Sequence, residues 1–98
     1  MSVTAFHFWS PTCAPCKAIK PAIDDLKEEF PQVVWLSVNL HDDKEGLSER
    51  YKVAVVPTIV VETKSNDGVV LSVDKYSGTN VSGYYRMLNS SMKVIRQS

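Results

Sequence analysis

The 98-residue sequence is poor in the features that mark several classes of protein. It has only two cysteines, two histidines and four glycines, and its eleven basic residues balance eleven acidic ones. A chain without a basic run gives no electrostatic reason to expect nucleic acid or an anionic membrane as a partner. No apolar run approaches the roughly 20 residues that a membrane-spanning helix needs. We therefore expect neither nucleic acid nor membrane binding.

The amino-terminal segment MSVTAFHFWSPTC also lacks a targeting signal. It has no basic region followed by an apolar stretch and a small-residue cleavage site, so we expect a cytoplasmic protein. In that reducing compartment two cysteines indicate catalysis or metal binding more than a structural bridge. A hydrophobic content of 44% can furnish a single core, so we expect one domain over residues 1–98 and a monomer.

Apolar periodicity predicts an alternation of strands and helices that is typical of α/β proteins. The predicted order is strand, helix, strand, helix, strand, strand, helix. The first half contains a strand at 3–9, a helix from Cys16 to Pro31 that is kinked at Pro21, and a buried strand at 33–40. A short helix follows after Asp42 or Asp43, and then two strands joined by a turn at 65–68. The last helix has the apolar positions Val81, Tyr85, Leu88, Met92 and Ile95.

The stretch WSPTCAPCK contains both cysteines, Cys13 and Cys16, and allows three interpretations. A structural disulfide that closes about four residues would stabilise the fold by only roughly 2 kcal/mol, against about 3 kcal/mol for fifteen residues. A zinc site needs about four ligands, and beyond the thiolates only His7 and His41 are present, so we expect no metal. A shared iron–sulfur cluster is equally unsupported.

The third interpretation is a redox pair, which the predicted position of the cysteines favours. Cys13 falls where a strand turns into a helix, and Cys16 falls within the first helical turn. Unpaired backbone N–H groups and the helix dipole would stabilise a thiolate on Cys13. Cys16 could then displace a mixed disulfide from within and close the internal bridge.

Five features together resemble the thioredoxin family: Trp9, the CAPCK motif at 13–17, Pro21, the VVPT motif at 55–58, and Gly78. The resemblance implies a thioredoxin fold of the minimal βαβαββα kind. Its four-stranded mixed sheet would have the order second, first, third, fourth, with the third strand antiparallel and helices on its faces. It also implies a cis bond between Val56 and Pro57, which only an X-Pro step tolerates readily.

The resemblance further implies a thiol–disulfide oxidoreductase that acts on protein disulfides without a cofactor. Cys13 would be the nucleophile and Cys16 the resolving cysteine, and the substrate-binding residues would be Trp9, Thr12, Ala14, Pro15, Val56 and Pro57. Electrons would come from a partner similar to thioredoxin reductase or from glutathione. The alternative is a binding module of the same fold that docks an extended peptide near Pro57 without redox turnover.

The sequence departs from the family pattern at several positions. The strand that bears Trp9 begins almost at Met1, whereas typical thioredoxins start with an additional strand and helix, so we expect the strand at 33–40 to form an exposed sheet edge. Thr12 stands where tryptophan is common and Ala14 where glycine is usual, which implies a different contact surface. The linking Ala14-Pro15 supplies no cation, so we expect a reductant, with isomerase activity also open.

His7 stands where the family usually has a buried aspartate, and Ser37 approximately matches its accompanying lysine. A neutral imidazole with an unperturbed pKa of about 6.5 could take the proton from Cys16 as it attacks. A histidine that only packs and forms hydrogen bonds is the structural alternative. We treat His7 as a candidate catalytic residue on the strength of its position.

Overall fold

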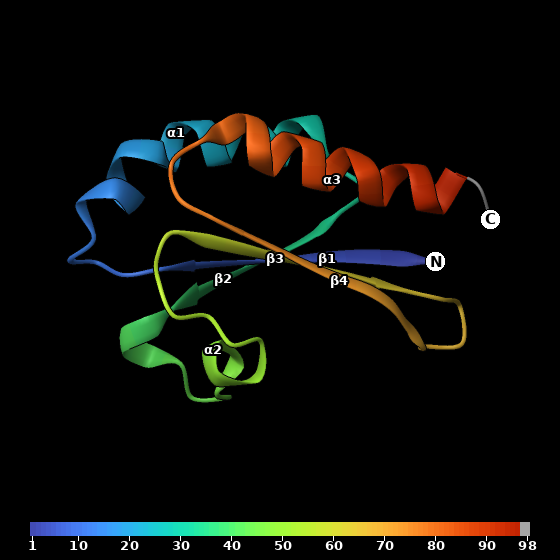
Figure 1. Cartoon of the computed structure of the whole chain (residues 1–98), viewed down its shortest axis with the longest axis horizontal. Helices are drawn as coiled ribbons and strands as arrows, with labels where there is room; N and C mark the ends of the chain where they lie inside the picture. The colour runs from blue at the N-terminus through green and yellow to red at the C-terminus, as the bar shows by residue number, and fades with distance from the viewer. Residues whose placement is uncertain (97–98) are drawn as a thin grey trace.

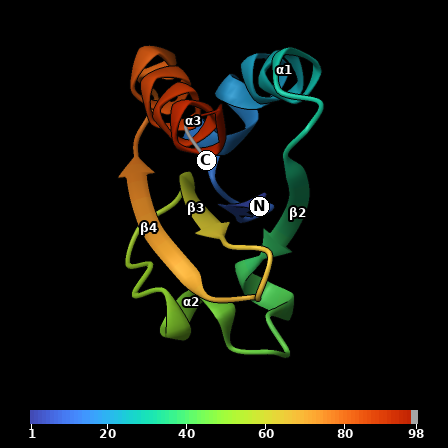
Figure 2. The same ribbon diagram turned by 90° about the vertical axis from the view of Figure 1, so that its right-hand side faces the viewer.

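The computed structural model describes residues 1–96, which form a four-stranded mixed sheet with helices on both faces (Figures 1 and 2). The strand order is β2-β1-β3-β4; β1 and β2 are parallel, and β3 is antiparallel to both of its neighbours. The fold class, strand order and strand directions predicted from the sequence are thereby confirmed. The elements are β1 (Ser2–Trp9), α1 (Ala14–Glu29), β2 (Val34–Asn39), a 3-10 helix (Leu40–Asp42), α2 (Leu47–Arg50), β3 (Thr58–Lys64), β4 (Val70–Ser77) and α3 (Val81–Arg96).

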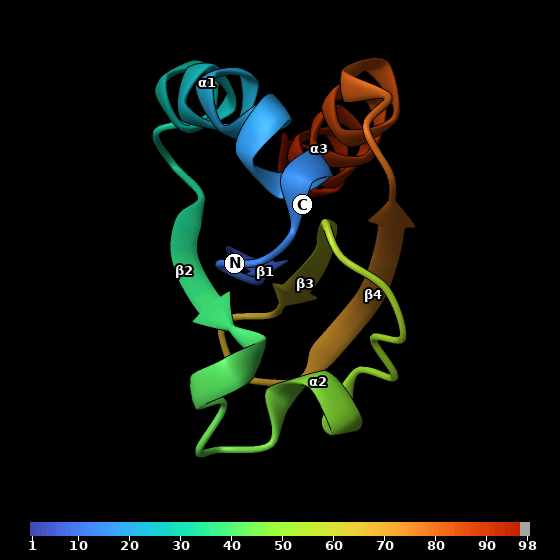
Figure 3. The ribbon, with the colours of Figure 1, turned by 90° about the vertical axis from the view of Figure 1, so that its left-hand side faces the viewer.

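The sheet separates two hydrophobic cores. Helices α1 and α3 cover one face, and the 3-10 helix and α2 lie against the other (Figure 3). The first core is the larger and includes Ile23, Tyr84 and Leu88, while the second is built around Phe6, Phe8 and Val60. Because β1 and β3 are central strands, their side chains are buried on both faces, as their nearly continuous apolar sequences indicate.

Local side-chain interactions fix the helix boundaries. Helix α1 continues through Pro21 and ends at Glu29, and the N–H of its C-cap residue Phe30 donates to the carbonyl oxygen of Leu26. The carboxylate of Asp43 accepts hydrogen bonds from the backbone N–H groups at the start of α2, at 2.9 Å each. The side chain of Asn80 accepts from the N–H of Ser82 and caps α3. Short polar side chains thus accept hydrogen bonds at the start of both helices, although the N-cap residue of α2 is Gly46.

The buried face of α3 differs from the prediction by one residue. The sequence pattern placed Tyr85 among the apolar positions, but Tyr85 is 43% exposed, with its ring centre 5.5 Å from that of Phe30. Tyr84 is fully buried instead and packs edge-on against Tyr76, with 5.1 Å between the ring centres. The prediction was wrong because the two tyrosines are adjacent, and helical periodicity alone does not decide which one faces the sheet.

Strand β2 is an edge of the described sheet, as expected. It pairs with β1, and its side chains at Val34 and Leu36 are 52% and 44% exposed. The other edge is β4, which pairs with β3. These edges leave backbone groups of both strands without a partner strand within residues 1–96.

The chain is arranged so that the cysteines lie far from both of its ends. The beginning of β1, the β3–β4 turn and the end of α3 lie at one end of the molecule, and the loop from β1 to α1 lies at the other (Figure 1). The amino group of Met1 donates to the side chain of Asn66 in the β3–β4 turn. None of the helices formed by residues 1–96 is long and apolar enough to cross a membrane.

Candidate active site

The two cysteines form a disulfide where the chain leaves β1 and enters α1. Their Cα atoms lie 5.2 Å apart. Cys13 is the N-cap residue of α1, and its sulfur accepts a hydrogen bond from the backbone N–H of Cys16 at 3.1 Å. Pro15 lies in the first helical turn, where a missing N–H leaves no intrahelical bond unmade. The fold therefore holds the Cys-x-x-Cys pair at the positive end of a helix dipole.

The two sulfur atoms occupy different environments. Cys16 is 6% exposed, whereas Cys13 is partly exposed at the start of the helix. The first turn of α1 contains no acidic side chain that would repel a thiolate. After reduction, the N–H of Cys16 and the helix dipole stabilise negative charge on Cys13. The geometry thus distinguishes an accessible sulfur that can attack from a covered sulfur behind it.

The loop before β3 lies against this pair. The sulfur of Cys13 is 3.7 Å from the carbonyl oxygen of Val56, and the peptide bond between Val56 and Pro57 is cis. Pro57 is buried, and the hydroxyl of Thr58 donates to the carbonyl oxygen of Val55 at 2.7 Å. The fold therefore brings Cys13, Cys16, Val56 and Pro57 together, although Cys13 and Val56 are 43 positions apart in the sequence.

Tyr84 supports the proline loop from beneath, and the sequence analysis assigned it no role. Its hydroxyl lies 3.2 Å from the carbonyl oxygen of Pro57 and also donates to the carbonyl oxygen of Gly78. The N–H of Gly78 donates to the same oxygen of Pro57 at 3.0 Å. Burial raises the pKa of Tyr84 to about 12, so the hydroxyl keeps its proton and remains a donor. The available signal was a tyrosine four residues beyond Asn80, the cap of the last helix.

The rim of the site is formed by exposed residues before and after Cys13. Thr12, Ala14 and Pro15 are all exposed, as contact residues must be. The hydroxyl of Ser10 lies 3.0 Å from that of Thr12 and 3.2 Å from Nε2 of His41. From the sequence alone, His41 was a candidate metal ligand and nothing more. Its contact with Ser10 was not predictable, because the fold brings the 3-10 helix close to this loop. Ser10, itself in contact with His41, therefore holds the side chain of Thr12, the residue that precedes Cys13.

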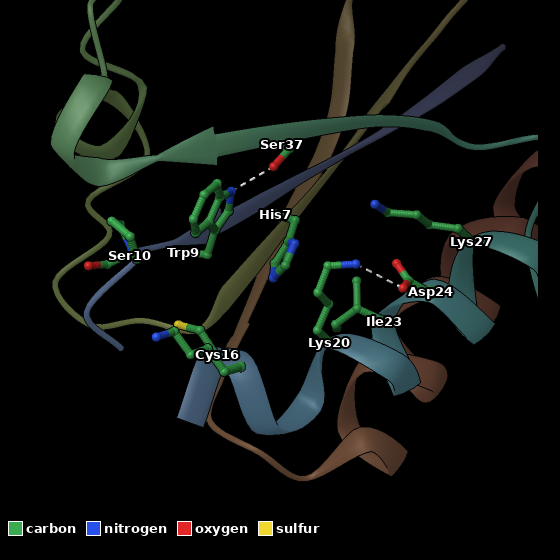
Figure 4. Close-up of a pocket in the computed structure, with 11 residues that line it drawn as sticks. His7, Trp9, Ser10, Cys16, Lys20, Ile23, Asp24, Lys27 and Ser37 are labelled. Atoms are coloured by element: carbon green, nitrogen blue, oxygen red, sulfur yellow. Dashed lines mark hydrogen bonds and ion pairs between the residues drawn. The ribbon is translucent and has the colours of Figure 1, made fainter. Parts of the chain in front are cut away.

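A pocket of about 200 Å³ opens between α1, β1 and β2 on the buried side of the disulfide (Figure 4). Trp9 forms part of its wall, and its ring N–H donates to the hydroxyl of Ser37 at 2.6 Å. Ser37, which approximately matches the position of the family's lysine, is thus the hydrogen-bond partner of Trp9. Cys16 and His7 also line the pocket, so the covered sulfur and the imidazole share one cavity.

His7 lies in the middle of this pocket, with its ring pointing from β1 towards α1 (Figure 4). It is 7% exposed, and Nε2 has no hydrogen-bond partner among the residues that the structure describes. Burial, with a smaller contribution from the positive charge of Lys27, lowers the pKa of His7 to about 4. The expectation of an unperturbed pKa near 6.5 was therefore wrong. The ring is neutral at pH 7, as expected, but it is a weaker base.

Other charged groups are arranged on the same side of α1. Lys20 and Asp24 form an exposed ion pair at 3.0 Å, and the hydrogen bond from Lys20 lowers the pKa of Asp24. Both residues line the pocket, together with Lys17 and Lys27. Within residues 1–96, no group of three or more histidine, cysteine, aspartate or glutamate side chains is placed to hold a metal ion.

Comparison with known proteins places this arrangement in a family. The family model described as Thioredoxin matches residues 2–88, which include both cysteines and Pro57. Thioredoxin 1 of Synechococcus elongatus is 29% identical over 76 residues, which cover 74% of this chain and 70% of that relative. The thioredoxin of Haemophilus influenzae is 35% identical over 54 residues, or 55% of this chain and 50% of the relative.

Solved structures agree with the sequence matches. Fasciola hepatica thioredoxin has a TM-score of 0.74 and 27% identity over 92% of this chain and 81% of its own. Some curated relatives are matched over half of their length or less, for example 29% of the chloroplast M-type thioredoxin of Spinacia oleracea and 50% of the thioredoxin of Pyropia yezoensis. Since the family match extends from β1 into α3, the chain belongs to the thioredoxin family.

Proposed function

We propose that this protein is a thiol–disulfide oxidoreductase that reduces disulfides of protein substrates. The observation that carries the proposal is the pair itself: a partly exposed Cys13 at the amino end of α1, with Cys16 covered one turn behind it. Membership of the thioredoxin family supports it. In this reaction the dithiol is oxidised to a disulfide, and the substrate disulfide is reduced to two thiols.

The exchange takes place in two steps. The Cys13 thiolate attacks one sulfur of the substrate disulfide, forms a mixed disulfide and displaces the other substrate sulfur as a thiolate. Cys16 then loses its proton and attacks the sulfur of Cys13, which closes the Cys13–Cys16 bond and releases the second substrate thiol. The Cys13–Cys16 disulfide of the described structure corresponds to the product state of this sequence.

The substrate is proposed to bind as an extended segment across the rim. The backbone of Val56 lies beside Cys13, and Thr12, Ala14 and Pro15 are exposed around it. The adjoining Pro57 holds this backbone in place, and Trp9 supports the loop from within. Polar backbone contacts at Val56 would align the segment, and the small rim side chains would leave room for varied residues.

His7 is proposed to accept the proton of Cys16 as the internal bond forms. The two residues line the same pocket, and the neutral ring at pH 7 has a nitrogen lone pair available. The pKa of about 4 weakens His7 as a base. We therefore expect a contribution at the lower end of the roughly 10²–10⁴-fold that general acid–base catalysis provides.

The role of His7 is tested by comparing His7→Ala and His7→Asn with the native protein. Both variants should slow the closing of the Cys13–Cys16 bond by about 100-fold and change the pH profile of that step. The first step, measured with a substrate under conditions that trap the mixed disulfide, should keep its rate. An unchanged rate and pH profile of bond closing in folded variants would remove His7 from the mechanism.

The residues between the two cysteines indicate the preferred direction of disulfide exchange. Ala14 and Pro15 place no cation between the cysteines, so the couple should have a potential nearer the about −270 mV of thioredoxin than the about −120 mV of strongly oxidising pairs. We propose that a thioredoxin-reductase-like protein or glutathione supplies the electrons. A thioredoxin f2 that shares this fold was solved in complex with ferredoxin:thioredoxin reductase. Isomerisation of non-native disulfides would use the same first attack.

We further propose that residues 1–98 act as one monomeric domain in the cytoplasm. A single sheet carries both cores of the described residues 1–96. A cytoplasmic location agrees with a dithiol that must be kept reduced between turnovers. Sedimentation analysis of the reduced protein tests the oligomeric state.

The experiment that tests the function is the reduction of insulin by dithiothreitol. The native protein should accelerate the reaction, and Cys13→Ser should abolish the acceleration. Cys16→Ser should retain the first attack and accumulate a mixed disulfide, which mass spectrometry detects. Ser90→Ala, an exposed change on α3, serves as the folded control. Equal rates for the native protein and Cys13→Ser would favour a peptide-binding module without redox turnover.

A further inference from the structure

No part of the protein substrate enters the pocket beside Cys16 in the two proposed exchange steps. The pocket lies on the inner side of the disulfide, whereas the proposed protein substrate would lie on the outer side near Val56. Its volume of about 200 Å³ is below the roughly 300–1,000 Å³ of sites for drug-sized ligands, so any occupant must be small. Its walls include the apolar surfaces of Trp9, Pro11 and Ile23.

One polar atom in this pocket has no protein partner. Nε2 of His7 is covered and forms no hydrogen bond with any residue of the described chain, although His7 is 93% buried. Leaving a buried donor or acceptor unpaired costs about 1–3 kcal/mol, and native structures keep few such atoms. The neutral ring can carry its proton on Nε2, so an acceptor from outside the chain would satisfy it.

The charged groups of the pocket have an excess of one sign. Lys17, Lys20 and Lys27 line it together with a single acidic residue, Asp24. Asp24 is already paired with Lys20, and neither Lys17 nor Lys27 forms an ion pair within residues 1–95. Two ammonium groups therefore remain at the pocket without an ion-pair partner, although Lys27 also feels the charge of Asp24. They would attract an anion, and they sit on flexible stems that can reach one.

We propose that this pocket is a binding site for a small carboxylate with an apolar tail. The tail packs against Trp9 and Ile23, the carboxylate lies between the ammonium groups of Lys17 and Lys27, and one of its oxygens accepts the proton of His7 Nε2. The tail thus meets apolar residues of the wall, and the carboxylate meets lysines that form no ion pair and a nitrogen that has no hydrogen-bond partner in the described chain. The site does not depend on the proposed redox activity, because no cysteine takes part in binding.

Butyrate is a suitable probe because it has both parts and is small. The oxidised protein is titrated with butyrate and, separately, with butyramide, which has a similar shape and no charge. Nuclear magnetic resonance follows the ring N–H of Trp9 and the imidazole of His7. We expect saturable shifts at both residues with butyrate and at least tenfold weaker binding of butyramide.

Variants identify the residues that bind the probe. Lys27→Gln and Lys17→Gln, which change side chains at the pocket surface, should each weaken butyrate binding several-fold, and His7→Phe should do so by about tenfold. Lys93→Gln, which removes an exposed lysine of α3, should bind like the native protein and controls for overall charge. The lysine variants keep the test valid if His7→Phe does not fold.

Three results would overturn the inference. The first is the absence of any saturable shift, which would mean that Nε2 is satisfied by water alone. The second is equal binding of butyrate and butyramide, and the third is the same loss of affinity in Lys93→Gln as in Lys27→Gln. All measurements use the oxidised protein without turnover, so their outcome is independent of the insulin assay.

Discussion

His7 is a buried imidazole with a lowered pKa, and this couples the stability of the fold to pH. Its pKa of about 4 in the folded state lies below the value of about 6.5 expected in the unfolded chain. Between these values the unfolded chain binds a proton that the folded chain does not, so the free energy of unfolding must fall as the pH falls. The contribution is fully present above about pH 6.5, and roughly 3 kcal/mol of it is lost by pH 4.

We predict that His7→Leu removes this acid-dependent loss. Urea unfolding of the oxidised protein between pH 4 and 7 should give a clearly flatter curve of unfolding free energy for the variant. Ile23→Val, in the wall of the same pocket, is the matched control and should lower stability by about 0.5–1.5 kcal/mol at every pH. Parallel curves for the native protein and His7→Leu would show that His7 titrates normally in the fold.

The hydroxyl of Tyr84 is a second polar group whose removal should change the stability of the fold measurably. We predict that Tyr84→Phe lowers the free energy of unfolding by about 1–2 kcal/mol, because the partly buried carbonyl oxygen of Gly78 loses its hydroxyl donor and that of Pro57 keeps only the N–H of Gly78. It should also slow insulin reduction if Pro57 positions the substrate. The matched control is Tyr85→Phe, since that ring is 43% exposed. Equal effects of the two changes on stability would contradict the assigned role of Tyr84.

Helix α3 packs on β4 at a contact that tolerates no side chain. A Cβ atom at Gly83 would overlap the ring of Tyr76, which is itself packed against Tyr84. We predict that Gly83→Ala destabilises the fold by about 1–3 kcal/mol through overpacking, despite the gain of about 1 kcal/mol that alanine brings to a helix. Thermal unfolding of the oxidised protein measures this difference.

A second substitution reverses the sign of that effect. In a Tyr76→Leu background the colliding ring atoms are absent, so Gly83→Ala should become neutral or stabilising by up to about 1 kcal/mol. A double-mutant cycle therefore separates the steric cost at this contact from helix propensity. The same penalty in both backgrounds would place the strain elsewhere in α3.

At the scale of the whole molecule, we expect the β2 edge of the sheet to promote self-association at high protein concentration. Strand β2 has the sequence VWLSVN, which contains no charge or proline, and Leu36 is 44% exposed. Such edges can pair with another chain. We predict that Leu36→Lys slows aggregation of concentrated protein, followed by light scattering, and changes stability by no more than about 0.5 kcal/mol.

The control for the edge prediction is a lysine of equal charge on a helix. Val94 is 40% exposed on α3, so Val94→Lys adds the same charge away from any sheet edge. If both variants slow aggregation equally, net charge and not the edge is responsible. A larger effect of Leu36→Lys identifies β2 as the surface through which copies meet.

The path of the chain was readable from the sequence because it depends on local patterns. The order of strands and helices along the chain was indicated by apolar alternation, amphipathic periodicity and an Asp-Gly turn, and the strand-to-helix position of Cys13 indicated the place of the cysteine pair. The order of the strands within the sheet was implied by the resemblance to the thioredoxin family and not by these local patterns. The pKa of His7, the pairing of Trp9 with Ser37 and the burial of Tyr84 were not predictable, because they depend on distances between elements. His41 reaches Ser10 for the same reason, across a gap of 31 positions.

The opposed placement of the disulfide and the chain ends has a practical consequence. The beginning of β1 and the end of α3 lie at one end of the molecule, and the loop from β1 to α1, which contains Cys13, lies at the other (Figure 1). A surface linker or an affinity handle attached at either end would orient every copy with its sulfur pair facing the solution. An immobilised layer of this protein should therefore capture disulfide-bearing partners as trapped conjugates on Cys13 without steric hindrance from its own support.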